Sequence, residues 1–401
     1  AGAALALLPA AAAAAEAAGA RPFRKVTLEG VDKLAVCSDG SPAAYYWRPG
    51  TTDLKTWIVD LEGGGWCWSE ETCRWRCPPG TQSNLCSSRR DPWVLVEHGL
   101  FGPTQDATLD GANKVFVRYC SSDAHMGDGA AFGLHFRGAR ILRAVLSDLV
   151  ARRGLGRGRD AELVILAGQS AGARGAMVHL DYVRGMLAGG GLEAAAAGVE
   201  VVGLLDSPLW IDVPSFSGAV SLGDRCAGVY SYANISHAGD ACTGAHPEEP
   251  WKCIMGQYRM PHVDTPYFLV ASQYDSYQLT ENVGHKPTTQ AERAYAERFA
   301  SQTLHAIESL RARWPSTARR QNAVFSWACY NHATTLSDRG FERDTCGGET
   351  IHAAVLQFLA PGAGPARQEW VDKCKGFACG PGCTGARGED GLPQRVAAIF
   401  A

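Results

Sequence analysis

The residues best suited to covalent chemistry are Gly168-Gln-Ser-Ala-Gly172, which directly follow the apolar run Leu163–Leu166. The residues after them, Ala173 to about Leu187, predict a helix. A strand, a sharp turn and a helix with Gly-x-Ser-x-Gly at the turn indicate a nucleophile elbow, where a strained backbone presents the serine hydroxyl. We therefore predict Ser170 as a nucleophile and the Ala171 amide as an oxyanion donor. The alternative is a serine in an ordinary strand-to-helix loop that caps the helix.

A glycine run provides the second feature of such a site. Lys55–Leu61 predicts a buried strand, and Glu62-Gly-Gly-Gly-Trp66 follows it. Glycines at this point allow backbone amides to turn inward towards an oxyanion, and each such donor stabilises a transition state by roughly 3 kcal/mol. A flexible hinge is the alternative, but Trp66 and Trp68 beside the run favour a rigid loop.

An acid and a base are expected where other strands end, because open α/β sheets place their sites at the carboxyl ends of the strands. Asp275 follows the predicted strand 266–274 and His332 follows the predicted strand 322–328. Ser170, Asp275 and His332 then stand in the order nucleophile, acid, base, which is the order of α/β-hydrolases. Asp206, which ends the predicted strand 198–206, is the rival acid and otherwise a pocket-lining residue. The remaining histidines weighed as candidates lie in a predicted helix (His352), within segment 213–261 (His237 and His246) or directly after that segment (His262).

Strands alternate with helices along the chain, which predicts an α/β class. The fold expected is α/β-hydrolase-like, with a mostly parallel central sheet, helices on both faces and disulfide-rich loop insertions. Further strands are predicted at 23–28, 43–48 and 113–119, and further helices at 136–152, 288–313 and 349–360. We expect 322–328 to be the last core strand.

The amino-acid composition indicates in which cellular compartment the protein acts and which classes of partner are not favoured. The chain has 401 residues and a net charge of −3, which does not favour nucleic acid or an anionic membrane as a partner. Its 14 cysteines indicate an oxidising compartment and up to seven disulfides. The alternative is a reduced protein with structural zinc, for which Cys374, Cys379 and Cys383 are the best candidates. Asp123, His125 and Asp128 resemble metal ligands, but pocket lining or turn chemistry is expected there.

The chain divides into three parts by composition. Residues 1–20 form an alanine-rich leader or signal-peptide remnant, with Ala18-Gly-Ala20 as a cleavage site. Residues 21–360 form a single α/β-hydrolase domain, in which 213–261 is an insertion or lid. Residues 361–401 form a tail rich in cysteine, glycine and proline. No integral membrane span is expected, and the sequon Asn234-Ile-Ser236 is consistent with secretion.

Several of these motifs together resemble the pectin acetylesterase/Notum family of secreted carboxylesterases. They are Leu61-Glu-Gly-Gly-Gly-Trp-Cys67, Gly168-Gln-Ser-Ala-Gly172, Asp181, Asp206-Ser207, Tyr274-Asp-Ser-Tyr-Gln-Leu279 and Cys329-Tyr-Asn-His332. The resemblance covers about Lys25 to Phe358. It implies an α/β-hydrolase fold without metal or cofactor, a triad of Ser170, Asp275 and His332, and an oxyanion hole of Gly64, Gly65 and Ala171. It also selects Asp275 over Asp206 as the acid.

The sequence departs from the family pattern near the motifs. Ala173 stands where the family usually has glycine, Gln169 stands where plant members have cysteine, and Ala333 replaces a cysteine after the histidine. The family's disulfide pattern therefore does not transfer whole.

The function expected is removal of O-acetyl groups from a cell-wall-type polysaccharide outside the cell or in the endomembrane lumen, through an acyl-enzyme. Trp66 and Asp206 are expected to contact the substrate. One alternative is a Notum-like deacylase acting on a lipidated protein or a lipid. The other is an inactive extracellular binding protein on a hydrolase fold.

Overall fold

In the computed structural model, residues 22–81, 83–95, 99–102, 106–158, 162–189, 198–314, 320–360 and 369–383 are described. The predicted leader 1–20 lies outside these ranges, as do 361–368 and 384–401 of the predicted tail.

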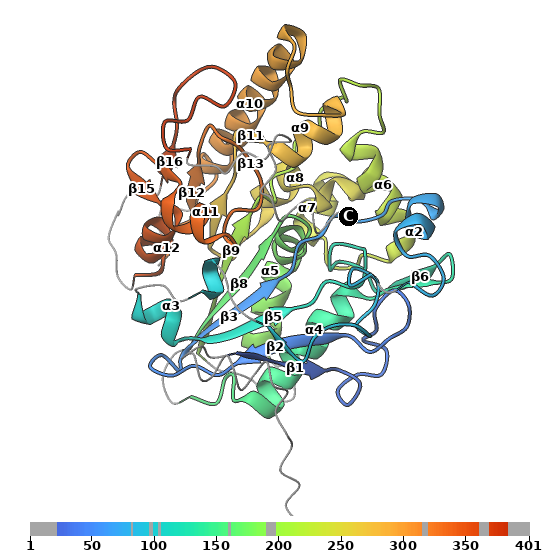
Figure 1. Cartoon of the computed structure of the whole chain (residues 1–401). Coiled ribbons are helices and arrows are strands. Elements are labelled where there is room, and N and C mark those ends of the chain that lie inside the picture. Colours follow the sequence, from blue (N-terminus) through green and yellow to red (C-terminus); the bar gives the residue numbers. More distant parts are fainter. Residues whose placement is uncertain are drawn as a thin grey trace, which may run out of the picture.

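Within the described residues, ten strands form one sheet (Figure 1). In spatial order they are β16 (Glu369–Val371), β12 (Ala323–Ser326), β10 (Tyr267–Val270), β9 (Val199–Asp206), β8 (Glu162–Gln169), β3 (Thr56–Leu61), β5 (Asn113–Val117), β2 (Ala44–Arg48), β1 (Phe23–Thr27) and β4 (Val94–Leu95). Neighbours pair in parallel from β16 through β5, and β2, β1 and β4 continue the sheet in antiparallel pairing. The predicted mostly parallel α/β-hydrolase-like sheet is confirmed.

The other elements of the described chain surround this sheet. Three two-stranded pairs are β6 (Gly129–Ala131) with β7 (Leu134–Phe136), β11 (Tyr274–Asp275) with β13 (Tyr330–Asn331), and β14 (Thr345–Cys346) with β15 (Glu349–Thr350). The α-helices are α2 (Glu70–Arg76), α3 (Ala107–Gly111), α4 (Gly138–Asp148), α5 (Ala171–Gly189), α6 (Leu222–Ala233), α7 (Asp240–Ala245), α8 (Gly256–Arg259), α9 (Ser276–Val283), α10 (Gln290–Arg311), α11 (Asp338–Arg343) and α12 (Ile351–Leu359). Shorter helical turns span Gly99–Phe101, Leu149–Arg153, Pro250–Ile254 and Met260–His262.

The period-two pattern of the central strands explains the two layers of helices. Val164 and Leu166 of β8 point into a core shared with α4 and α5, whereas Ile165 and Ala167 point into a second core shared with α3 and α12. Successive side chains of a strand face opposite sides, so an uninterrupted apolar run fits a strand buried on both faces. In Figure 1 helices α6 to α9 gather at the end of the sheet where β3, β8 and β9 finish.

Two details of the strands differ from the prediction. Residues 322–328 do not contain the last core strand, because β16 from the tail pairs in parallel with β12. The predicted strand 266–274 is split: β10 ends at Val270, and Tyr274 and Asp275 instead form β11 with β13. The change of partner carries Asp275 out of the main sheet and beside the segment that leads to His332.

Six disulfides join twelve of the cysteines. They are Cys37–Cys120, Cys67–Cys73, Cys77–Cys86, Cys242–Cys253, Cys329–Cys383 and Cys374–Cys379. The upper limit of seven is not reached, because Cys226 in α6 and Cys346 in β14 are free and buried. The zinc alternative for Cys374, Cys379 and Cys383 is wrong, since all three sulfurs are bonded in disulfides. In the ranges described, no helix has both the length and the apolar character needed to cross a membrane.

Candidate active site

Ser170 lies at the turn between β8 and α5 with a positive backbone φ of 53°. This is a strained conformation for a residue other than glycine. Its amide donates to the carbonyl of Asp206 (2.9 Å), so the end of β9 holds the turn in place. A Cβ on Gly172 would lie 1.8 Å from the Leu61 carbonyl, and one on Gly168 would lie 2.4 Å from Gly172. The small residues around Ser170 are therefore required by the close approach of β3, β8 and α5.

Asp275 and His332 are in direct contact. His332 Nδ1 lies 2.7 Å from Asp275 Oδ2, while Asp275 Oδ1 accepts a hydrogen bond from the Gln278 amide (2.9 Å) at the start of α9. The parallel pairing of β11 with β13 places Asp275 opposite Asn331, one residue before the histidine. The His332 ring also stacks on Tyr277, with 5.3 Å between ring centroids. One imidazole nitrogen and one face of the ring are thus fixed.

The other ring nitrogen of His332 and the hydroxyl of Ser170 are not engaged in hydrogen bonds with the described residues. Both His332 Nε2 and Ser170 Oγ are buried and have no hydrogen-bond partner among the described residues. Buried polar atoms are normally paired, so two unpaired ones in one region indicate atoms that act on a ligand.

Asp206 and Ser207 link the serine and histidine segments. The Asp206 carbonyl accepts from the Ser170 amide, and its carboxylate accepts from the amide (2.7 Å) and hydroxyl (2.9 Å) of Thr335. Ser207 donates to Asp206 Oδ1 and accepts from the amide of Ala333, the residue after the histidine (3.1 Å). Residues 206 and 207 therefore hold both segments against the end of β9. Asp206 itself is fully buried with its oxygens in use, a geometry that favours a positioning role over the substrate contact expected from the sequence.

Two carbonyl groups of the glycine loop after β3 accept hydrogen bonds from side chains outside the loop. Arg76 donates to the Gly64 carbonyl and the Tyr119 hydroxyl donates to the Gly65 carbonyl (2.7 Å). The φ angles of Gly64 and Gly65 are 149° and 65°, which favour glycine. The Gly64 carbonyl shares its peptide group with the Gly65 amide, so the hydrogen bond from Arg76 fixes the orientation of that amide. The Ala171 amide is one of the unpaired donors at the N-terminus of α5.

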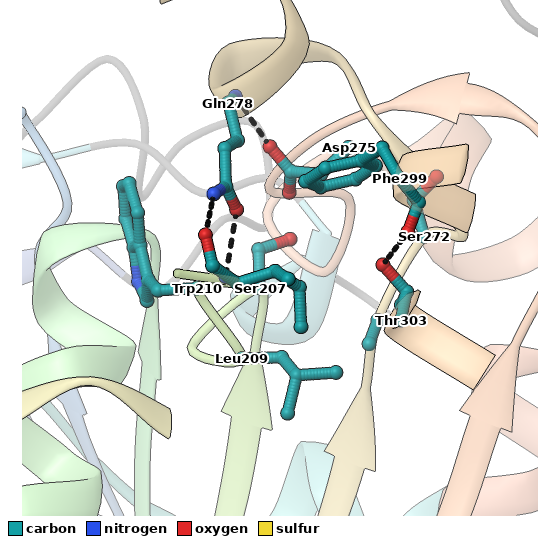
Figure 2. A pocket seen from close by; sticks show the side chains of 10 residues that line it. Ser207, Leu209, Trp210, Ser272, Asp275, Gln278, Phe299 and Thr303 are labelled. Carbon is teal, nitrogen blue, oxygen red and sulfur yellow. Dashed lines mark hydrogen bonds between the residues drawn. The ribbon is translucent and has the colours of Figure 1, made fainter. Parts of the chain in front are cut away.

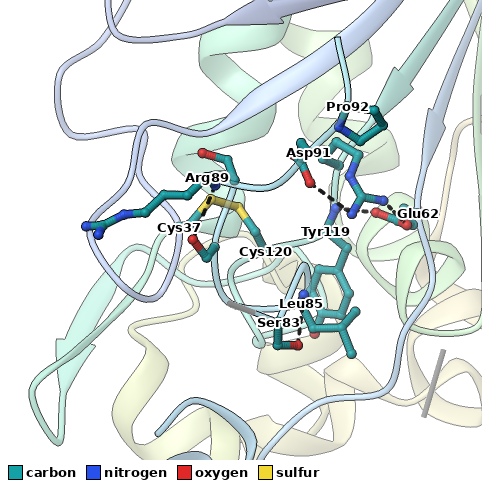
Figure 3. A network of polar contacts seen from close by, with 12 residues as sticks. Cys37, Glu62, Ser83, Leu85, Arg89, Asp91, Pro92, Tyr119 and Cys120 are labelled. Atoms are coloured by element: carbon teal, nitrogen blue, oxygen red, sulfur yellow. Dashed lines mark hydrogen bonds and ion pairs between the residues drawn. A yellow bond between two sulfur atoms is a disulfide. The ribbon is translucent and has the colours of Figure 1, made fainter. Parts of the chain in front are cut away.

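A buried ionic network anchors the start of the same loop (Figure 3). The Glu62 carboxylate accepts from the Tyr119 amide (2.8 Å) and pairs with Arg118, whose other nitrogen lies 3.3 Å from Asp91. The disulfide Cys37–Cys120 follows directly in the chain. Burial raises the pKa of Glu62, and Arg118 and the Tyr119 amide oppose that rise. The network therefore supports the glycine loop from the side of β5, whereas Ser170 follows β8 on the other side of β3.

The protonation of the candidate base is controlled by the carboxylates near it. Burial by itself lowers the pKa of His332, but the charge and hydrogen bond of Asp275, helped by the charge of Asp206, outweigh burial and leave that pKa raised. Burial also raises the pKa of Asp206, against its hydrogen bonds to Thr335 and Ser207. Stabilisation of the imidazolium is what a general base needs while it holds the serine proton.

A small cavity lies behind Asp275, between the segment after β9 and helix α10 (Figure 2). Gln278 crosses its edge: the side-chain oxygen accepts from the Ile211 amide (3.0 Å) and the side-chain nitrogen donates to the Ile211 carbonyl. Figure 2 shows Trp210 and Asp275 on either side of this side chain. Gln278 therefore fixes the acid and the Trp210 segment relative to each other, a link that the sequence alone did not reveal.

Trp66, predicted to bind substrate, forms part of an aromatic cluster. Its ring centroid lies 6.4 Å from that of Trp210, and Trp210 lies 6.3 Å from the His332 ring. The guanidinium of Arg174 stands over both tryptophan rings, at 3.7 Å from Trp66 and 4.0 Å from Trp210. This arrangement has no signal in the sequence beyond one charged residue, four positions after Ser170, in a helix start that otherwise consists of small residues.

The other candidate residues have structural partners. Asp123 accepts from the Gly127 and Gly138 amides, His125 Nε2 contacts the Glu62 carbonyl, and Asp128 pairs with two arginines. This agrees with the turn chemistry expected for that loop. Among the described residues, no group of three or more His, Cys, Asp or Glu side chains could hold a metal. His352, in α12, contacts Glu342 in α11, and neither helix carries a residue of the candidate triad.

Asp181, which is part of the family resemblance, lies on α5 and holds the chain before β10. Its carboxylate accepts from Arg259 (2.9 Å) and from the amide (2.8 Å) and hydroxyl (2.7 Å) of Thr265. These contacts lower the pKa of Asp181 against the effect of burial, which raises it. Asp181 thus holds α8 and the chain that leads into β10 against α5.

Comparisons with known proteins show which family the chain belongs to. The family model described as pectinacetylesterase matches residues 21–384. Palmitoleoyl-protein carboxylesterase notum2 of Xenopus laevis is 30% identical over 374 residues, which cover 87% of this chain and 72% of that protein. Pectin acetylesterase 11 of Arabidopsis thaliana is 28% identical over 406 residues, covering 93% of this chain and 95% of the relative.

A solved structure shares the fold as well. The Wnt deacylase Notum from Drosophila superimposes with a TM-score of 0.78 and 25% identity, covering 91% of this chain and 99% of that one. Because the family model spans almost the whole chain and relatives of both branches align over most of their own length, the chain belongs to the pectinacetylesterase family and is a carboxylic ester hydrolase.

Proposed function

We propose that the protein hydrolyses esters through a triad of Ser170, His332 and Asp275. The observation that carries this proposal is the 2.7 Å contact between His332 Nδ1 and Asp275 Oδ2, combined with an unpaired His332 Nε2 and an unpaired Ser170 Oγ. Asp275 orients the imidazole so that its other nitrogen can accept the serine proton. The backbone anchors at Asp206 and Ser207 support this arrangement, since they hold both segments to one strand end.

In this mechanism Ser170 Oγ attacks the ester carbonyl while His332 Nε2 takes the hydroxyl proton. The amides of Gly64, Gly65 and Ala171 stabilise the oxyanion of the tetrahedral intermediate. His332 then gives its proton to the leaving alcohol as the carbon–oxygen bond breaks, which leaves an acyl-serine. Water, deprotonated by His332, attacks this ester; the carboxylic acid leaves and Ser170 regains its proton.

The acyl group we propose is acetyl, carried by a hydroxyl of a polysaccharide. Pectin acetylesterase 11 supports this assignment by its name and by an alignment that covers nearly both chains. The surroundings of His332 support it too, because Trp210, whose ring lies 6.3 Å from that of His332, stacks together with Trp66 on a buried arginine. A fatty acyl chain on a protein is the second candidate, and notum2 of Xenopus laevis supports it by its name.

The proposed location is outside the cell or in the endomembrane lumen. Six disulfides persist only where the environment is oxidising. Cys67–Cys73 directly follows the glycine loop and Cys329–Cys383 lies three residues before His332, so reduction would loosen the segments next to the candidate site. The alternative of an inactive binding protein does not fit a member of a carboxylic ester hydrolase family in which all three proposed triad residues are present.

Release of acetate from acetylated pectin or xylan, measured beside hydrolysis of 4-nitrophenyl acetate, tests this function. Ser170→Ala should lower turnover by on the order of a million-fold, and Ser231→Ala, on the exposed side of α6, is the matched control. Ser170-dependent acetate release supports the proposal. Hydrolysis of small esters without release from any polysaccharide would contradict the substrate class, and undiminished activity in Ser170→Ala would contradict the mechanism.

A further inference from the structure

Arg174, four residues after the proposed nucleophile, carries a charge into the interior of the protein. It lies in the first turn of α5, its amide donates to the Ser170 carbonyl (3.0 Å), and it is only 1% exposed. Its Nε and Nη2 atoms have no hydrogen-bond partner among the described residues. A guanidinium is rarely buried with two of its nitrogens unpaired, and the proposed mechanism gives Arg174 no role.

Two tryptophans hold this guanidinium in one place. Its Cζ lies 3.7 Å from the centre of the Trp66 ring and 4.0 Å from the centre of the Trp210 ring. Stacking on aromatic faces replaces part of the hydration that the cation loses. Trp66 directly follows the oxyanion loop, and Trp210 lies 6.3 Å from the His332 ring. Arg174 therefore stands between the loop that would bind the oxyanion and the residue that would act as base.

The space around Arg174 is rich in donors. Trp66 Nε1 and Trp210 Nε1 are also buried without partners in the part of the chain that the structure describes. The free thiol of Cys226, from α6, also adjoins the guanidinium. Burial lowers the pKa of Arg174. Unpaired buried donors favour contact with hydrogen-bond acceptors and disfavour contact with methylene groups, which cannot accept.

We propose that Arg174, held between Trp66 and Trp210, limits the acyl group of the substrate to a short one such as acetyl. This inference rests on the proposed esterase mechanism through Ser170 and makes its substrate class specific. The guanidinium fills the space beside the acyl carbon into which a longer chain would extend. A longer chain would have to displace the cation from its two aromatic partners and leave its donors facing hydrocarbon.

The test is the dependence of kcat/KM on acyl length, using 4-nitrophenyl acetate, butyrate, hexanoate and octanoate. In the wild type kcat/KM should fall with each lengthening. Arg174→Leu keeps the bulk near Ser170 but removes the charge and the donors, so the octanoate-to-acetate ratio should rise at least tenfold. For scale, each methylene that enters an apolar space contributes about 0.8 kcal/mol, or roughly fourfold.

Two further variants separate the effect of Arg174 from general damage. Arg174→Lys keeps a cation at this position and should retain the preference for acetate. Arg225→Leu is the matched control, because Arg225 is also buried and stacks 4.3 Å over a tryptophan, Trp68, but pairs with Glu281 and does not stack on Trp66 or Trp210. Its ratio of octanoate to acetate hydrolysis should equal that of the wild type.

An unchanged ratio in a folded Arg174→Leu protein would overturn the inference, as would an equal rise in Arg225→Leu. If Arg174→Leu does not fold, the wild type decides: Ser170-dependent hydrolysis that peaks at octanoate overturns the inference and leaves the triad standing. The absence of Ser170-dependent hydrolysis at every chain length overturns the triad and this inference together.

Discussion

Replacing Asp275 with asparagine should slow ester hydrolysis far more than the same change at Asp206. Asp275 Oδ2 contacts His332 Nδ1 at 2.7 Å, and an asparagine there would offer an amide or a neutral oxygen in place of the carboxylate. Loss of the correct imidazole tautomer and of imidazolium stabilisation lowers kcat by roughly 10⁴-fold in such triads. Asp206 contacts Thr335 and Ser207 and does not bond to the imidazole. An asparagine can keep the contact to Thr335, so we expect a loss of about tenfold or less, or about 1.4 kcal/mol.

The dependence of activity on pH gives the same experiment a second readout. His332 must be neutral to accept the serine proton, so kcat/KM should rise with pH as His332 loses its proton. Because Asp275 and Asp206 raise the pKa of His332, the midpoint in the wild type should lie above the usual value of about 6.5. Removal of the Asp275 charge should move the midpoint to lower pH, and removal of the Asp206 charge should move it less.

The assay is hydrolysis of 4-nitrophenyl acetate between about pH 5 and 9 for the wild type and both variants. Folding of each variant is checked by its thermal midpoint. A larger loss in Asp206→Asn than in Asp275→Asn would refute the assignment of the acid. A flat pH profile in the wild type would refute a histidine base.

Three further changes test the supports of the site. Gly172→Ala should destabilise the fold by about 3 kcal/mol in urea titration, since its Cβ would lie 1.8 Å from a carbonyl of β3, whereas Gly185→Ala on the same helix, with nothing within 4 Å, should not. Tyr119→Phe removes the hydroxyl that holds the oxyanion loop, so kcat should fall about tenfold while KM changes little, and a KM effect alone would contradict the role. Asp181→Ala leaves the buried Arg259 without its carboxylate and should cost about 3–5 kcal/mol of stability, with kcat per folded molecule retained.

Local sequence patterns were sufficient to predict the strand, turn and helix that position Ser170. The apolar run 163–166 and the small residues after it specify a strand, a turn and a helix, because packing at the turn tolerates only small side chains near Gly172. The general rule that sites lie at the carboxyl ends of parallel strands placed Asp275 and His332 in one region, although 57 positions separate them. Their contact depends on β11 leaving the main sheet, and that exchange of partner has no signature in a window of a few residues.

Features that depend on distant partners were missed. The sequence of β16, Glu369–Val371, is too short to show a period, and it becomes a strand only because the edge of β12 is open to it. An even number of cysteines suggested complete pairing, yet Cys226 and Cys346 are buried in different elements and stay free. The stacking of Arg174 between two tryptophans joins three separate segments, so only the fold reveals it.

The most direct test of the account is covalent labelling by a fluorophosphonate, which reacts only with an activated serine. The intact protein should gain the mass of a single label, and peptide mapping should place it on Ser170. Ser170→Ala should gain none, and Asp275→Asn should react slowly because its imidazole is no longer held by a carboxylate. A label on another serine, or ester hydrolysis by a wild-type protein that cannot be labelled, would contradict a mechanism through Ser170, His332 and Asp275.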